Sequence, residues 1–169
     1  SIAMWRYSAV SAWAAVPYDR RIDLCAEMLV RLNAMSFLIA QATTHTTGQG
    51  FAMAFQAGGP HAQDRGLEAL AASALELERT PVVADWTKPQ GRAEPIRLAK
   101  SWRVTPRGVG LVIGCNTFPT WNSYPALFAD LAIGASVIVK PHPRAILPLA
   151  LTVKVAREVY DKVPYMSEV

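Results

Sequence analysis

The sequence predicts an α/β fold in which N-terminal helices precede the first part of a doubly wound parallel sheet. The first observation behind this prediction is that apolar side chains recur at helical spacing across residues 18–40, 50–57 and 61–79. The second is that the last third follows the order strand, turn, helix, strand, turn, helix, which is typical of parallel sheets. The sequence contains no internal repeat.

Glycine, proline and threonine residues divide the helical part into separate predicted helices. Residues 43–48 are expected to interrupt the first helix, because β-branched threonines disfavour a helix and Gly48 suits a helix end. Residues 58–60, Gly-Gly-Pro, are expected to separate the helix at 50–57 from the helix at 61–79.

The middle of the chain differs in composition from the helical part. Residues 80–95 are polar and contain several prolines and a glycine, which indicates a linker. Residues 96–104 alternate apolar and polar side chains, a pattern typical of an exposed antiparallel strand or arm.

Two short apolar runs follow. Residues 109–113 form a continuous apolar run, so we expect a strand that is covered on both faces. A helix at 121–133, ended by Gly134, should lead to a second buried strand at 136–139. A final helix is expected from about residue 146 to residue 160.

Composition excludes several classes of protein. The chain has 169 residues, 51% of them hydrophobic, which fits one globular domain and not a disordered chain. The net charge of +4 comes from scattered side chains and not from a concentrated basic stripe. The net charge is therefore the only feature that would support nucleic-acid binding. No apolar run is long enough for a membrane span, and the start lacks a signal-peptide pattern. Two cysteines without metal-ligand spacing indicate no metal site and favour a reducing, cytoplasmic setting.

A ligand site is expected at the turns that follow the two apolar strands, residues 114–119 and 140–143. In open parallel sheets, ligands bind beyond the carboxyl ends of the strands, and both turns occupy that position. The Gly-x-Gly-x-x-Gly fingerprint of ordinary dinucleotide-binding folds is absent after the first of these strands.

The residues around these turns resemble two segments of the aldehyde dehydrogenase superfamily. Residues 106–113, PRGVGLVI, followed by Phe118-Pro119, resemble the segment PxGxVxxIxPWNFP. Gly134 and then Lys140-Pro141 resemble ALAAGNxVVxKPSExTP, and the interval between the two segments aligns without a gap. The resemblance implies an aldehyde-dehydrogenase-type doubly wound sheet behind N-terminal helices.

A more specific resemblance covers most of the chain. The stretches HTTGQGFAMAFQAGGPHAQDRGLEAL and GCNTFPTWNSYPALFADLAIGASVIVKPHPRAILPLALTV are similar to the aldehyde dehydrogenases of phenylacetic acid degradation, of the PaaN type. This resemblance implies a role in phenylacetate, or more broadly aromatic, catabolism. An aromatic or ring-opened aldehyde as substrate follows by analogy only.

The family resemblance implies oxidation of an aldehyde to an acid with a nicotinamide cofactor. In the family a cysteine thiolate attacks the carbonyl, hydride passes to the cofactor, and water activated by a glutamate releases the acid. An asparagine in the PWNFP turn helps to hold the oxyanion. Ungapped alignment places Thr117 at that asparagine and Asn116 one residue earlier, so both are candidate catalytic residues. Asn116 is equally interpretable as a turn residue that bonds its own backbone.

The resemblance also implies a cofactor site. Lys140 matches the family lysine that reaches the adenosine ribose, and Pro143 replaces a glutamate that disfavours a 2′-phosphate there. We therefore expect NADP to be preferred, with NAD as the alternative. Cys115 matches a family proline and not the nucleophile, which favours a structural thiol. The candidate cofactor-binding residues are Ile113, Gly114, Cys115, Asn116, Lys140, His142, Pro143 and Arg144.

Three regions are predicted: an N-terminal helical segment at 1–79, a linker with an oligomerisation strand at 80–105, and the first half of the nicotinamide-binding domain at 106–169. The family's nucleophilic cysteine and glutamate match nothing in this chain. We therefore expect a fragment that is inactive alone, from an enzyme that acts as a homo-oligomer on a small aldehyde, without nucleic-acid or membrane partners. The alternative is a non-catalytic binding or assembly module that reuses the fold.

Overall fold

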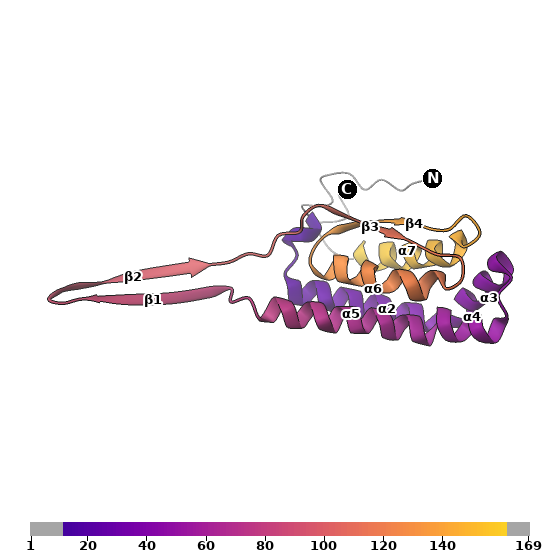
Figure 1. Ribbon diagram of the computed structural model, residues 1–169, viewed down its shortest axis with the longest axis horizontal. Helices are drawn as coiled ribbons and strands as arrows, with labels where there is room; N and C mark the ends of the chain where they lie inside the picture. Colours follow the sequence, from indigo (N-terminus) through magenta and orange to yellow (C-terminus); the bar gives the residue numbers. More distant parts are fainter. Residues whose placement is uncertain (1–11, 162–169) are drawn as a thin grey trace.

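The computed structural model describes residues 12–161, which form a helical body with one long β-hairpin projecting from it (Figure 1). The body contains the helices α2 to α7, a short helical segment at residues 12–15 and a two-stranded parallel sheet. In order along the chain the elements are α2 (Tyr18–Ala34), α3 (Ser36–Thr47), α4 (Phe51–Gly58), α5 (Pro60–Glu78), β1 (Val83–Gln90), β2 (Ala93–Ser101), β3 (Val109–Ile113), α6 (Pro119–Ala132), β4 (Ser136–Lys140) and α7 (Ile146–Tyr160).

The predicted first helix is two helices. It breaks at Met35, whose backbone angles, φ −95° and ψ 7°, depart from α-helical values. The expected interruption at residues 43–48 was wrong, because α3 continues through Thr47. Each threonine hydroxyl of Thr43, Thr46 and Thr47 donates to the carbonyl four residues earlier, so these side chains are satisfied inside the helix. The predicted end at Gly48 is confirmed, since its φ of +78° is left-handed.

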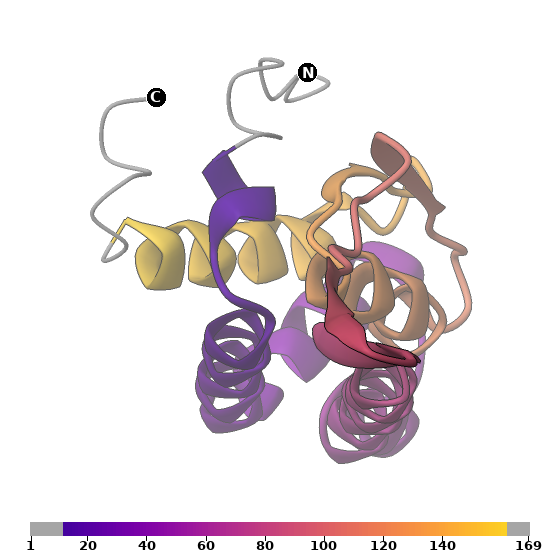
Figure 2. The same cartoon turned by 90° about the vertical axis from the view of Figure 1, so that its left-hand side faces the viewer.

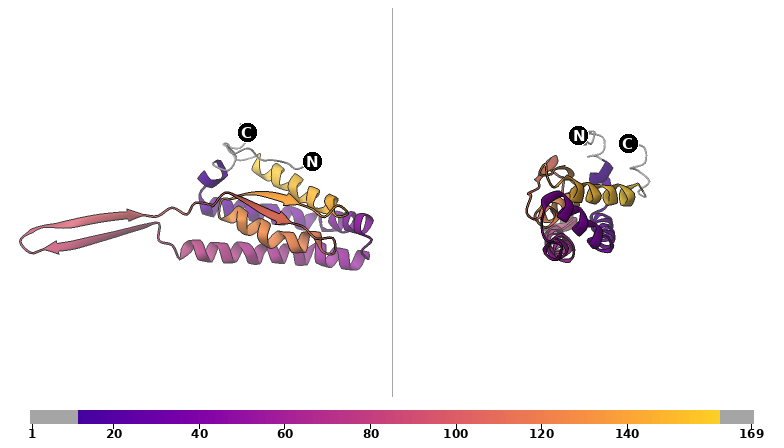
Figure 3. Two further views of the ribbon diagram at one scale, coloured as in Figure 1. Left: turned by 45° about the horizontal axis from the view of Figure 1, so that its top comes forward. Right: turned by 90° about the vertical axis from the view of Figure 1, so that its right-hand side faces the viewer.

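The polar segment at 80–95 contains a strand that the sequence did not reveal. β1 pairs antiparallel with β2, and the register places Trp86 opposite Leu98 and Thr87 opposite Arg97. Both strands are exposed almost throughout. The arm predicted at 96–104 is therefore a hairpin, here called the arm (residues 83–101), and it extends well beyond the helices when the molecule is viewed from the side (Figure 1 and the left view of Figure 3).

β3 and β4 form the predicted parallel pair, with Val109 opposite Ser136 and Ile113 opposite Lys140. Val112, Val137 and Val139 face the helices and join the core. The expectation that the first strand is covered on both faces was wrong for the part of the chain described here. On the other face, Leu111 is 61% exposed and Ile113 is 66% exposed.

One hydrophobic core joins the N-terminal helices to the segment that carries the sheet. The core contains Leu24 and Met28 of α2, Phe128 of α6 and Val155 of α7, all nearly inaccessible to solvent. The end-on view shows α2 and α5 side by side below α6 and α7 (Figure 2). Gly66 lets α5 pass close to α2 and α6, because a Cβ there would lie 2.7 Å from Leu29 Cδ2 and 3.0 Å from Phe128 Cδ2.

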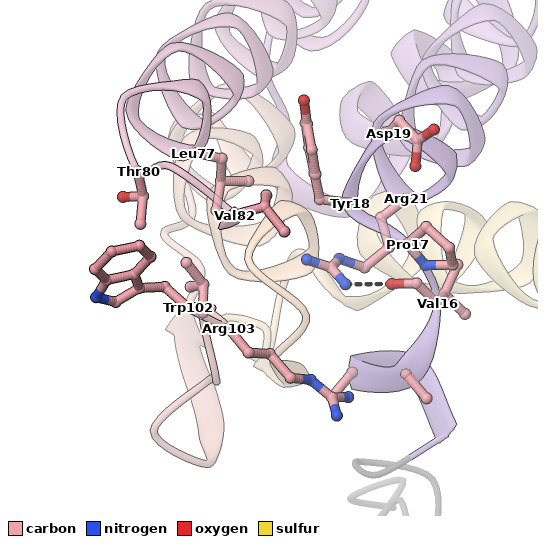
Figure 4. Close-up of a pocket in the computed structure, with 13 residues that line it drawn as sticks. Val16, Pro17, Tyr18, Asp19, Arg21, Leu77, Thr80, Val82, Trp102 and Arg103 are labelled. Atoms are coloured by element: carbon pink, nitrogen blue, oxygen red, sulfur yellow. Dashed lines mark hydrogen bonds between the residues drawn. The ribbon is translucent and has the colours of Figure 1, made fainter. Parts of the chain in front are cut away.

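Arg21 ties the start of α2 to the end of α6. Its Nε–H donates to the carbonyl of Ala132 at 2.9 Å, and a second N–H donates to the carbonyl of Val16 (Figure 4). A guanidinium at these carbonyls also suits the negative end of the α6 dipole. Beside it, a cavity of about 660 Å³ lies between this corner and the root of the arm, where Trp102 and Arg103 line it.

Candidate functional site

The candidate site lies at the carboxyl ends of β3 and β4, where two turns run side by side. The backbone N–H of Gly114, just after β3, donates to the carbonyl of Lys140, the last residue of β4, at 2.9 Å. This bond continues the parallel pairing one residue past β3. The structure therefore brings the two predicted turns, 114–119 and 140–143, to the same edge of the sheet.

Gly114 allows the first turn to pass close to α7 and α6. A Cβ at this position would lie 2.8 Å from Leu149 Cδ1, 3.2 Å from Ser123 Oγ and 3.5 Å from the Cα of Pro141. The first of these distances is too short for a real side chain without a shift of Leu149. The turn thus needs glycine at 114 for close packing, and its φ is not in the left-handed region.

Cys115 organises the inside of the first turn. Its Sγ accepts the backbone N–H of Phe118 at 3.3 Å and the side-chain amide of Asn122 at 2.7 Å. The thiol is half-buried. Helix α6 then starts at Pro119, where a missing N–H costs nothing. The sulfur therefore links the turn to the first turn of α6, which agrees with the structural interpretation of Cys115.

Asn116 and Thr117 differ in their surroundings. Asn116 is half-buried, and its Oδ1 is buried without a hydrogen-bond partner. Thr117 is exposed, and its carbonyl accepts an N–H of the Gln49 side chain at 2.8 Å. Both residues line a cavity of about 240 Å³ together with Thr47, Gly48 and Gln49 from the loop between α3 and α4.

The second turn is held by hydrogen bonds among its own residues. His142 Nδ1 accepts the backbone N–H of Arg144 at 3.2 Å, and the carbonyl of His142 accepts the N–H of Ala145 at 2.9 Å. With Nδ1 as an acceptor, Nε2 is the ring nitrogen left to donate. Lys140, Pro143 and Arg144 are exposed, so this turn presents cationic groups to solvent.

The chemistry of these two turns fits a dinucleotide. A phosphate or ribose needs N–H and cationic donors, which Lys140, His142 and Arg144 supply, and it needs close backbone approach, which Gly114 permits. Ile113, opposite Lys140, offers an exposed apolar side chain at the same edge. Among the described residues there is no cluster of three side chains suited to a metal ion.

Three residues of this region were missed by sequence reasoning: Gln49, Thr120 and Asn122. Thr120 Oγ1 donates to the carbonyl of Gly58 at 3.0 Å, which ties the start of α6 to the end of α4. Asn122 carried a weak signal, because it lies one turn into the helix after the motif. Gln49 carried only its place between two glycines. Separately, no helix within residues 12–161 is long and apolar enough to cross a membrane.

Solved structures of aldehyde dehydrogenases resemble this chain. The NAD-dependent aldehyde dehydrogenase from Burkholderia multivorans is 56% identical, with a TM-score of 0.87 over 92% of this chain and 28% of its own length. The aldehyde dehydrogenase from Bartonella henselae has a TM-score of 0.64, and aldehyde dehydrogenase 21 from Physcomitrella patens, in complex with succinate, has 0.62. Both are 16% identical and match over 89% of this chain and 31% of theirs, so they show the fold alone.

The similarity is to a part of those proteins. Neither family models nor curated protein sequences gave a match to the chain. The chain spans less than a third of the length of each of the three solved structures. The described residues therefore have the fold of a segment of an aldehyde dehydrogenase.

Proposed function

We propose that this chain is part of a nicotinamide-dependent aldehyde dehydrogenase and supplies the first two strands of its cofactor sheet. One observation carries the proposal: the chain is 56% identical, over 92% of its length, to an aldehyde dehydrogenase of known structure. The parallel pair with its two turns at one edge is consistent with a cofactor site. The overall reaction consumes an aldehyde, water and NAD(P)⁺ and yields an acid, NAD(P)H and a proton. When bound, the cofactor accepts the hydride.

In this reaction the residues of this chain bind and orient the reactants. Attack on an aldehyde carbonyl places negative charge on its oxygen, and donors set in advance lower that barrier. We assign this role to Asn116 and not to Thr117. The Nδ2 amide of Asn116 supplies two N–H donors, and Asn116 lines the small cavity beside the turn. Thr117 is fixed through its carbonyl and carries a shorter side chain with a single donor.

The second turn supplies the proposed preference for NADP. Lys140, His142 and Arg144 offer donors and positive charge to a 2′-phosphate, and Pro143 places no carboxylate against it. NAD is the competing cofactor, because the Burkholderia multivorans protein is described as NAD-dependent. The test is kcat/KM of the full-length protein with each cofactor and the same aldehyde. A higher value with NADP is expected, and a clear preference for NAD contradicts this part of the proposal.

The substrate is proposed to be an aldehyde of aromatic catabolism, in the phenylacetate pathway. The support is the PaaN-type resemblance of residues 45–70 and 114–153. A panel of aromatic, ring-opened and short aliphatic aldehydes tests it through kcat/KM of the full-length protein. Higher values for short aliphatic aldehydes would leave the dehydrogenase assignment intact and remove the pathway.

The arm is proposed to mediate homo-oligomer contacts. One face of the hairpin carries Trp86, Ile96 and Leu98, all exposed, beside two lysines, Lys88 and Lys100. Such an apolar face on an isolated hairpin is typical of an interaction site. It also favours the alternative of an assembly module. A double change, Trp86→Asp with Leu98→Asp, should lower the oligomeric state measured by light scattering. If activity is absent while assembly is intact, the module interpretation is favoured.

A further inference from the structure

The loop between α3 and α4 contacts the turn that carries Asn116. Gln49 Nε2 donates to the carbonyl of Thr117 at 2.8 Å, across a sequence separation of 68 residues. Gln49 is half-buried, and it lies between two glycines. No other residue of this loop has a described side-chain hydrogen bond to the turn at 114–118.

The backbone around Gln49 is fixed on both sides. Its own N–H donates to Thr47 Oγ1 at 3.2 Å, and Thr47 Oγ1 donates to the carbonyl of Thr43 at 2.7 Å. Gly48 ends α3 with a left-handed φ of +78°. On the far side, the carbonyl of Gly50 accepts the N–H of Ala54 at the start of α4. The end of α3 and the start of α4 therefore fix the backbone from which the Gln49 side chain reaches the turn.

The receiving turn has an unmet acceptor next to this bond. Asn116 Oδ1 is buried without a partner, and Asn116 lines the same small cavity as Gln49. A buried unpaired acceptor costs about 1–3 kcal/mol. The Gln49 amide has two N–H donors, and only one is used by Thr117. A hydrogen bond from this second N–H to Asn116 Oδ1 would fix the direction of the Asn116 amide.

We propose that Gln49 is a positioning residue that holds the turn at 116–117 so that the Asn116 amide meets the developing oxyanion. This inference rests on the proposed function. It extends the site from the cofactor sheet to the N-terminal helices. A second, buried hydrogen bond, from Thr120 Oγ1 to the carbonyl of Gly58 at 3.0 Å, ties the start of α6, which follows this turn, to the end of α4.

The first test is steady-state kinetics of the full-length protein. Gln49→Ala should lower kcat roughly ten- to a hundredfold, because misplacing a reacting group has effects of this size. The cofactor KM should stay within about twofold of the wild-type value, because the Gln49 side chain donates to the first turn at Thr117, whereas the second turn is held by bonds of its own, such as that from Arg144 N–H to His142 Nδ1. Gln56→Ala, an exposed glutamine on α4, is the matched control and should change neither. An unchanged kcat in Gln49→Ala overturns the proposal.

Gln49→Glu separates positioning from a merely structural role. An ionised glutamate has no proton to donate to the Thr117 carbonyl, so kcat should fall at pH 8. A protonated glutamate regains the donor, so the ratio of variant to wild-type kcat should rise as the pH falls towards about 5. The control Gln56→Glu should give a flat ratio. A flat ratio in Gln49→Glu overturns the proposal.

Hydrogen exchange distinguishes failure of this inference from failure of the proposed function. In Gln49→Ala the amides of residues 114–122 should exchange faster than in the wild type and in Gln56→Ala. Equal exchange overturns the role of Gln49 even in an active enzyme. If the wild type oxidises no aldehyde, the proposed function fails, and the exchange result alone then decides whether Gln49 holds the turn.

Discussion

The two strand pairs of this molecule are stabilised in different ways. β1 and β2 form a long antiparallel arm with almost no buried side chain, whereas β3 and β4 are shorter and contribute Val112 to the core. The arm is held by cross-strand pairs such as Trp86 with Leu98, each worth about 0.2–1 kcal/mol. The parallel pair is held by burial against α6 and α7. Strand pairing by itself therefore says little about where the stability of the chain comes from.

The comparison also separates two kinds of exposed apolar surface. On the arm, apolar residues occupy one face of a ribbon that protrudes into solvent (Figure 1). On the parallel pair, Val109, Leu111 and Ile113 form the face opposite the helices. Only the second surface is continuous with the candidate site, because Ile113 directly precedes Gly114.

The largest expected effect comes from removing a core side chain of α6, the helix that packs on the parallel pair. Phe128 is fully buried, and it contacts Tyr124 with ring centroids 5.4 Å apart. Phe128→Ala should lower the free energy of unfolding by about 3–5 kcal/mol. Trp86→Ala on the arm should change it by less than about 1 kcal/mol. Urea denaturation of both variants measures this contrast. Equal losses of the free energy of unfolding would contradict the difference between the two strand pairs.

An intermediate effect is expected where the helices meet the arm. Arg21 is buried and donates to the carbonyls of Ala132 and Val16. Burial lowers the pKa of its guanidinium, and Arg103 lowers it further. Hydrogen bonds to charged groups contribute about 1.5–3 kcal/mol, and Arg21→Ala should destabilise the chain by about that amount. Arg20→Ala, at an exposed neighbour, is the control. A thermal shift as small as that of the control would contradict the role of Arg21.

The smallest effect concerns pH. Burial raises the pKa of the Cys25 thiol to about 12, from about 9 in an unfolded chain. The folded state therefore holds this proton where the unfolded state loses it, so stability should fall as the pH rises from about 9 towards 12. The slope should reach about 1.4 kcal/mol per pH unit at most for this group. Cys25→Ala should flatten the decline between pH 9 and 10, before the buried tyrosines titrate. A slope unchanged by the substitution would contradict this assignment.

Much of the fold was predictable because local signals were consistent with it. Gly48, Gly59 and Gly134 end helices or separate them, as expected from their freedom to adopt unusual backbone angles. The parallel pair followed from two apolar runs separated by one helix length. The strand β1 was missed because Asp85, Pro89 and other turn-forming residues mask its pattern.

The candidate site was predictable only in part, for a physical reason. The positions of Gly114 and Lys140 follow from the rule that ligands bind at the carboxyl ends of parallel strands, and their backbones are hydrogen-bonded. The contact of Gln49 with Thr117 depends on how the helical layer packs on the sheet. No local pattern reports such a long-range contact. The open face of β3 was missed because an apolar run is the same whether one face or both are covered.

The central claim is that the turn at 114–118 serves aldehyde oxidation through Asn116. The most direct measurement is aldehyde-dependent reduction of NADP⁺ and NAD⁺ by the full-length protein and its variants. The wild type is expected to turn over the aldehyde, Asn116→Ala to lose about 10²–10³ in kcat, and Thr117→Ala to lose at most a severalfold factor. An active wild type with an equally active Asn116→Ala would contradict the role of the turn. A folded wild type that reduces neither cofactor with any aldehyde would contradict the enzyme assignment itself.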